Sequence, residues 1–171
     1  GQAERWYDLL QVIERQVELV DAPAEIVAHR YRVGQLWEKR LQDPTRAVEA
    51  YEVALRMDPT HEPTLLALDG LAHGEGEPVL AAQVLLPIYE QAAEFERLVD
   101  LYEVMARHAA DPFRKVELLH QIANLCEFRL GQHGAAFSAY GRALAEDPSN
   151  TQTLEHLERL ADATRGWEPL A

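Results

Sequence analysis

The sequence is short of cysteine, of long apolar runs and of clustered basic residues. Its 171 residues include one cysteine, so Cys126 cannot form an internal disulfide and fits a reducing compartment such as the cytoplasm. The longest apolar stretch, 79–86, is interrupted by Gln83 and followed by Pro87. A membrane-spanning helix needs ~20 apolar residues. These absences exclude a disulfide-stapled scaffold and predict no membrane partner.

Positive charge is scarce and scattered. Lys and Arg total 16 against 29 Asp and Glu, a formal net charge of −13, and the acidic excess is shared evenly between the two halves of the chain. Adjacent basic residues occur only at Lys39–Arg40 and Arg114–Lys115. Because nucleic-acid binding needs a clustered cationic face, we expect no nucleic-acid partner. A neutral or basic protein or peptide suits this charge better.

Motifs for catalysis and for cofactors are also missing. The sequence has no Gly-x-Ser-x-Gly elbow, and its glycine clusters at 74–76 and 131–134 follow no predicted strand. Seven histidines are present without an HExxH motif. Glu117 and His120 have the Glu-x-x-His spacing of di-iron bundles, but the second copy that such a site needs is absent. We therefore predict a protein that is not an enzyme and has no metal or cofactor.

The sequence does contain an internal repeat. Shifting the chain by 89 positions aligns 36–72 with 125–161, and 16 of these 37 positions are identical. Most of the identical residues are small or apolar and recur at helical spacing, as expected for a duplicated packing face. The repeat predicts a single 1–171 segment built from two related units, 1–89 and 90–171.

Every segment between turn signals has helical periodicity, and no alternating strand pattern occurs. We expect antiparallel helices, because the connections are short. An Asp before a Pro is expected to cap the helix that follows. The predicted helices are 3–20, 23–42, 44–57, 61–73, 78–92, 94–109, 112–130, 133–146 and 150–164, with a tenth beginning at Trp167.

Two stretches resemble the tetratricopeptide repeat (TPR). Its second helix and closing proline resemble Ala47-x3-Tyr51-x2-Ala54-x4-Pro59 and Ala136-x3-Tyr140-x2-Ala143-x4-Pro148, and its first helix resembles Val33-Gly34-x2-Trp37 and Ile122-Ala123-x2-Cys126. The resemblance is most specific over 28–59 and 117–148. It implies an all-α, right-handed α-α superhelix of nine to ten helices. The unfinished tenth helix suggests that the chain is a fragment of a longer array.

The resemblance also implies where a partner binds. The family's groove-facing positions correspond to Tyr31, Arg32, Gln35 and Lys39 in the first repeat and to Glu117, His120, Gln121, Asn124 and Phe128 in the second. Gln35 and Asn124 occupy equivalent positions, and an amide there can hydrogen-bond a peptide backbone. The alternative interpretation is that these are merely solvated helix residues.

Three functions remain open at this point. The first is a protein–protein interaction scaffold that binds a peptide or partner helix on its concave face. The second is a structural spacer, or a segment that self-associates through open solenoid ends into a homo-oligomer. The third, an enzyme with an unrecognised site, is the least favoured. Trp6 and Phe95, which occupy equivalent positions, are predicted to be packing anchors, with a binding role as the alternative.

Overall fold

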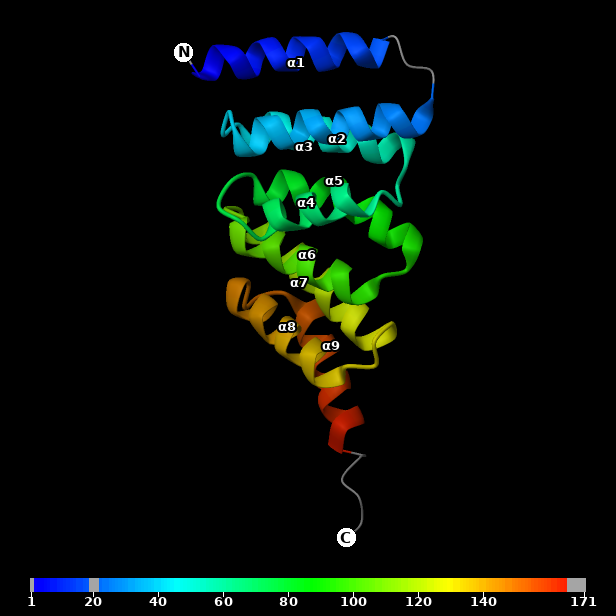
Figure 1. Cartoon of the computed structure of the whole chain (residues 1–171). Helices are drawn as coiled ribbons and strands as arrows, with labels where there is room; N and C mark the ends of the chain where they lie inside the picture. The colour runs from blue at the N-terminus through cyan, green and yellow to red at the C-terminus, as the bar shows by residue number, and fades with distance from the viewer. Residues whose placement is uncertain (1, 19–21, 166–171) are drawn as a thin grey trace. The chain divides into compact units, whose positions relative to one another are not determined.

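The computed structural model describes residues 2–18 and 22–165, and this part of the chain is all-α, with nine helices and no strand (Figure 1). The predicted bounds of the third, fifth and eighth helices agree at both ends, and the others differ by one to three residues. Residues 19–20 of the predicted first helix lie outside the described residues. The predicted tenth helix lies outside the described residues. None of the described helices is both long and apolar enough to cross a lipid bilayer. The helices are α1 (Gln2–Glu18), α2 (Pro23–Lys39), α3 (Pro44–Met57), α4 (Glu62–Ala72), α5 (Pro78–Ala92), α6 (Phe95–His108), α7 (Pro112–Phe128), α8 (His133–Glu146) and α9 (Thr151–Arg165).

The chain divides into two compact units, 1–88 and 89–171, and the border lies within α5. In the first unit α2 packs against both α1 and α3, and α3 packs against α4. In the second unit α7 packs against both α6 and α8, and α8 packs against α9. The two repeated units of the sequence, 1–89 and 90–171, meet one residue later. Each unit therefore has its own set of packed helices.

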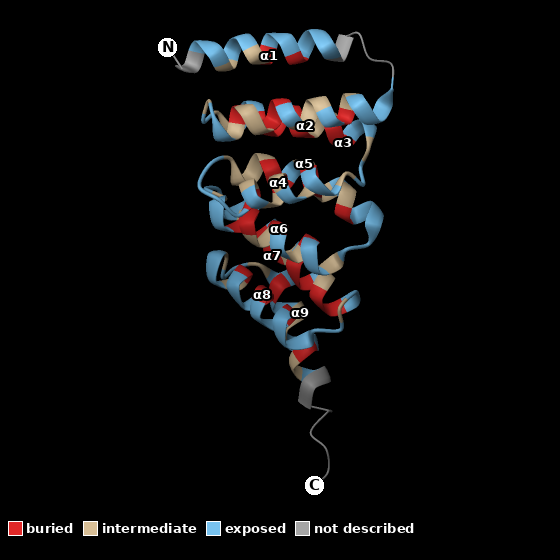
Figure 2. Cartoon of the chain, in the orientation of Figure 1, coloured by how far each residue is buried: buried red, intermediate tan, exposed pale blue. Residues whose placement is uncertain are grey.

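Small residues let the paired helices approach closely. The alanines at the TPR-like positions are fully buried, and so are the two tyrosines that follow them in the pattern (Figure 2). Cys126 is also buried, at 2% exposure, and burial raises the pKa of its thiol. The prediction that these residues form packing positions is confirmed. They are Ala47, Ala54, Ala136, Ala143, Tyr51 and Tyr140.

The Asp-Pro pairs have two different roles. Asp43 and Asp111 cap α3 and α7, where their carboxylates accept hydrogen bonds from backbone N–H groups of the first turn. Asp58 and Asp147 do not cap the next helix, so the prediction is wrong for them. Each follows the last residue of a helix and accepts hydrogen bonds from the residue two positions later. The proline after them therefore lies in a turn.

The turn between α2 and α3 has the same geometry as the turn between α7 and α8. Gln42 and Gly131 are equivalent positions, and both have positive φ, 54° and 65°. The residue after each one donates its N–H to a carbonyl six positions back, from Asp43 to Trp37 and from Gln132 to Cys126. This arrangement ends α2 and α7 with a left-handed residue, a common way to terminate a helix.

Trp6 and Phe95 are half-buried under equivalent arginines. The Arg40 guanidinium lies 5.1 Å from the Trp6 ring, and that of Arg129 lies 5.4 Å from the Phe95 ring. A cation over an aromatic face is attracted to the ring electrons. Each arginine directly follows the last residue of α2 or α7, so each pair joins the end of that helix to the helix before it, α1 or α6. This contact supports the anchoring role.

Candidate functional site

In the first unit, two of the four predicted residues contact each other and two extend into solvent. The Gln35 amide donates a hydrogen bond of 2.8 Å to the Tyr31 hydroxyl. Arg32 and Lys39 are exposed on α2. Tyr31 and Lys39 line a cavity of about 430 Å³ together with residues of α4, whereas Arg32 and Gln35 do not line it. The predicted set is therefore only partly gathered into one site.

In the second unit, the predicted residues gather more completely. His120, Gln121 and Asn124 line a groove of about 560 Å³. Phe128 does not line it; this ring lies at the end of α7, 65% exposed, with the Arg159 guanidinium 5.8 Å from its centroid. We call this cavity the α7 groove. Its lining residues are Glu90, Tyr102, Arg114, Glu117, Leu118, His120, Gln121, Asn124 and Gln152.

The Glu-x-x-His pair of α7 is already engaged within the protein. Glu117 accepts a hydrogen bond of 2.9 Å from Arg114, and the Nε2 atom of His120 is 2.8 Å from the Thr153 hydroxyl. Burial, and to a lesser extent His156, lower the pKa of His120. Within the described part of the chain no group of three or more His, Cys, Asp or Glu side chains could hold a metal ion.

A buried tyrosine in each unit makes a different hydrogen bond. Tyr51 donates to Glu38 at 2.6 Å, whereas its equivalent Tyr140 donates to Asn124 at 3.2 Å. The adjacent helix explains the difference. A Cβ atom at Gly34 would lie 2.3 Å from Cε1 of Tyr51, and the equivalent residue of the second unit is an alanine. The Tyr140 ring therefore cannot take the position that Tyr51 occupies.

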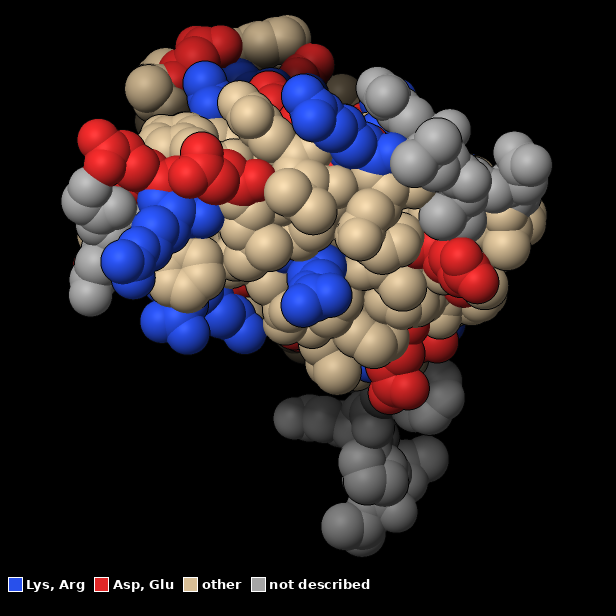
Figure 3. All heavy atoms as spheres, turned by 45° about the horizontal axis from the view of Figure 1, so that its top comes forward, with Lys and Arg blue, Asp and Glu red and all other residues tan. Residues whose placement is uncertain are grey.

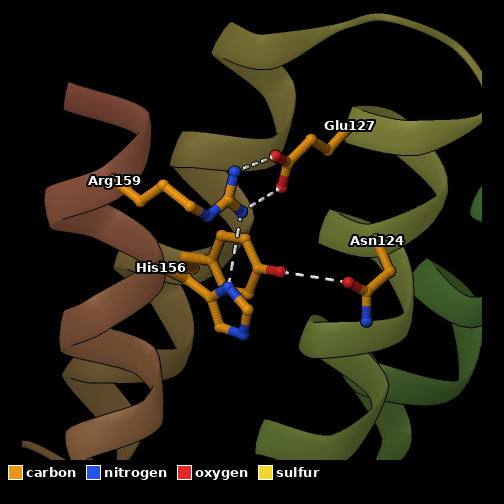
Figure 4. A network of polar contacts seen from close by, with 5 residues as sticks. Asn124, Glu127, His156 and Arg159 are labelled. Atoms are coloured by element: carbon orange, nitrogen blue, oxygen red, sulfur yellow. Dashed lines mark hydrogen bonds and ion pairs between the residues drawn. The ribbon is translucent and has the colours of Figure 1, made fainter. Parts of the chain in front are cut away.

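Because Tyr140 bonds to Asn124, the carboxylate of Glu127, which is the equivalent of Glu38, is available for another partner. Its carboxylate is only 4% exposed and accepts two hydrogen bonds from the Arg159 guanidinium (Figure 4). These hydrogen bonds hold the pKa of Glu127 below its usual range. Burial and the nearby Glu127 charge raise the pKa of the Tyr140 phenol. Asn124, Glu127, Tyr140 and Arg159 thus form one polar network, which also contains His156.

Sequence reasoning missed several residues of this site. Thr64 and Thr153 are equivalent, fully buried, and hydrogen-bonded to His61 and His120, respectively. The sequence offered a signal for them, because threonine occurs at this position in both repeated units. A polar residue among packing positions is expected to have a hydrogen-bond partner. His156 and Arg159 carried no such signal, since their equivalents are Ala67 and Gly70.

The arrangement offers binding groups rather than an activated nucleophile. The groove presents amides, a phenol, carboxylates and a guanidinium, and the one thiol, Cys126, is buried with a raised pKa. A raised thiol pKa reduces the thiolate that nucleophilic attack requires. The α7 groove can therefore form hydrogen bonds and ion pairs with a ligand.

No protein-family model, no curated protein and no solved structure matches this chain.

Proposed function

We propose that the chain is a TPR-like right-handed α-α superhelix that acts as a non-catalytic protein–protein interaction scaffold, binding an extended peptide in the α7 groove. The observation that supports this proposal best is the lining of that groove, where three amide side chains gather from α7 and α9. The resemblance of 28–59 and 117–148 to the TPR supports the superhelix. A single cysteine favours a reducing, cytoplasmic location.

The amides suit recognition of a peptide backbone. Each carries a donor and an acceptor, so it can match a peptide N–H and C=O without regard to the side chains of the peptide. Tyr140 donates to Oδ1 of Asn124, which orients the amide. In Figure 4 its Nδ2 atom points away from that bond, and no described residue accepts from it. Gln121 and Gln152 add further amides along the same groove.

Charge favours a neutral or basic partner. Glu90 and Glu117 line the groove, and its one arginine, Arg114, is paired with Glu117. The chain as a whole has a net charge of −13. On the face that Figure 3 shows, both basic and acidic side chains of the described residues occur. The carboxylates of the groove and the net negative charge would repel a carboxylate-terminated ligand and a nucleic acid, and they would steer a cationic peptide toward the protein.

Two exposed aromatic rings indicate the length of the binding surface. Phe113 is 71% exposed and Phe128 is 65% exposed, at the two ends of α7. Their spacing places them on one helix face, and a rise of about 1.5 Å per residue separates them by roughly 22 Å. An extended peptide of about seven residues covers that distance. Its apolar side chains could pack against the two rings.

The proposal is tested with peptides selected from a displayed random library on the purified chain. Selected peptides should be extended and neutral or basic. Binding of the best one, measured by calorimetry, should weaken about tenfold or more in the Gln121→Ala/Asn124→Ala variant, since two hydrogen-bonding side chains are lost. Gln91→Ala removes an exposed amide of the second unit outside the groove and should bind normally. If the wild type and both variants bind the peptide with equal affinity, or if the library yields no binding peptide, the spacer role is favoured.

A further inference from the structure

Equivalent positions of the two units hold an ion pair in one unit and a cavity in the other. In the second unit the Arg142 guanidinium of α8 donates two hydrogen bonds, of 2.6 and 2.9 Å, to the Glu103 carboxylate of α6. The equivalent residues of the first unit are Val53 and Glu14. They line an open cavity of about 350 Å³ between α1, α2 and α3, which we call the α1–α3 cavity. The first unit therefore retains the carboxylate but lacks the arginine.

The carboxylates of the α1–α3 cavity are unpaired. Glu14 and Glu49 both line it, and neither has a hydrogen-bond or ion-pair partner among the described residues. One arginine of the cavity, Arg46, already has other partners. It pairs with Asp43 at 3.6 Å, and its guanidinium lies 4.5 Å from the centroid of the Trp37 ring. Arg46 therefore does not neutralise the two glutamates.

The other arginine of the cavity is Arg30. Its Nε atom is buried and has no hydrogen-bond partner in the described part of the chain. The two unpaired carboxylates thus share the cavity with one unpaired cation, so one negative charge stays uncompensated. A cationic group complements that charge, and the net charge of −13 favours its approach.

The walls of the cavity suit the stem of a long side chain. Val33 and Ala50 line it and are buried, at 3% and 7% exposure, and Val53 is half-buried beside them. An arginine packs its aliphatic stem on such a surface while its charged end stays polar. The planar guanidinium also forms two parallel hydrogen bonds with one carboxylate, whereas a lysine ammonium acts as a point charge. Arginine therefore fits this cavity better than lysine.

We propose that the α1–α3 cavity binds an arginine side chain of a partner protein, and that its guanidinium pairs with Glu14 as the guanidinium of Arg142 pairs with Glu103. The template for this ligand lies in the protein itself, because an arginine occupies the equivalent position of the second unit. The cavity shares no lining residue with the α7 groove. The inference therefore does not depend on peptide binding in that groove.

The test is an NMR titration of the full chain with arginine blocked at both ends, N-acetylarginine N-methylamide. The methyl signals of Val33 and Val53 should shift until the site is saturated. Blocked citrulline has nearly the same shape without the charge, and it should bind about fivefold more weakly or worse. Glu14→Gln should weaken binding of the arginine probe by a similar factor. Glu75→Gln, which removes an exposed carboxylate of the same unit outside the cavity, should bind normally.

Two further variants exchange the chemistry of the two units. Val53→Arg copies the second unit and should abolish binding of the probe in the first unit, because the new guanidinium then occupies Glu14. Arg142→Val copies the first unit and should create a second site for the probe at Glu103. If Val53→Arg does not fold, the Glu14→Gln variant and the citrulline control decide the matter.

Three results would overturn the proposal. They are the absence of a saturable shift of the cavity signals in the wild type, equal affinity of the wild type and Glu14→Gln, and equal affinity of the arginine and citrulline probes. Shifts confined to residues of the α7 groove would also overturn it, but they would leave the proposed function standing.

Discussion

At the scale of single residues, the buried tyrosines of the two units have different hydrogen-bond partners. Gly34 allows the Tyr51 ring to lie against α2 and bond to Glu38, whereas the alanine at the equivalent position directs Tyr140 to Asn124. The buried small residues and tyrosines were predictable, because both copies retain them. The hydrogen-bond partners of the two tyrosines were not predictable, because they depend on small differences in the positions of the tyrosine rings.

Gly34→Ala should therefore destabilise the first unit. The new Cβ would lie 2.3 Å from the Tyr51 ring, so the ring must move and the hydrogen bond to Glu38 is lost. We expect a loss of about 1–3 kcal/mol in the free energy of unfolding, measured by chemical denaturation. Gly70→Ala is the control, because a Cβ there meets no atom within 4 Å and alanine favours the helix. A Gly34→Ala protein as stable as the wild type would refute the packing explanation.

At the scale of elements, helix positions followed from periodicity and turn residues, but the role of each turn did not. Asp43 and Asp58 both precede proline, yet only Asp43 caps the next helix. The sequence alone does not reveal whether the chain re-enters a helix directly after such a pair. The positive φ at Gln42 was hidden for a similar reason, because only its equivalent in the second unit is glycine.

Two alanine substitutions in the second unit should have opposite effects. Gly131→Ala forces a Cβ into the left-handed region at φ 65° and should cost about 1 kcal/mol of stability. Gly141→Ala, in the middle of α8 with open space around the new Cβ, should add about 0.5–1 kcal/mol. Thermal unfolding followed by circular dichroism measures both. Shifts of the same sign would show that the turn geometry is not as described.

At the scale of the whole molecule, the repeat predicted two related helical units, and the all-helical class is confirmed over the described residues. The candidate site was only partly predictable. The TPR pattern assigned residues of α2 and α7, four of which line the α7 groove, but it did not indicate Glu90, Tyr102 or Gln152. These come from α5, α6 and α9, so only the packing of the second unit brings them to α7.

The central claim is that the α7 groove binds an extended peptide. The most direct measurement is an NMR titration of the isotopically labelled chain with a library-selected peptide, mapping the amide and side-chain shifts by residue. The account predicts the largest changes at the Gln121, Asn124 and Gln152 side-chain amides, with the ring signals of Phe113 and Phe128 also moving. Changes confined to other helices, such as the exposed face of α8 around Phe137, would contradict it.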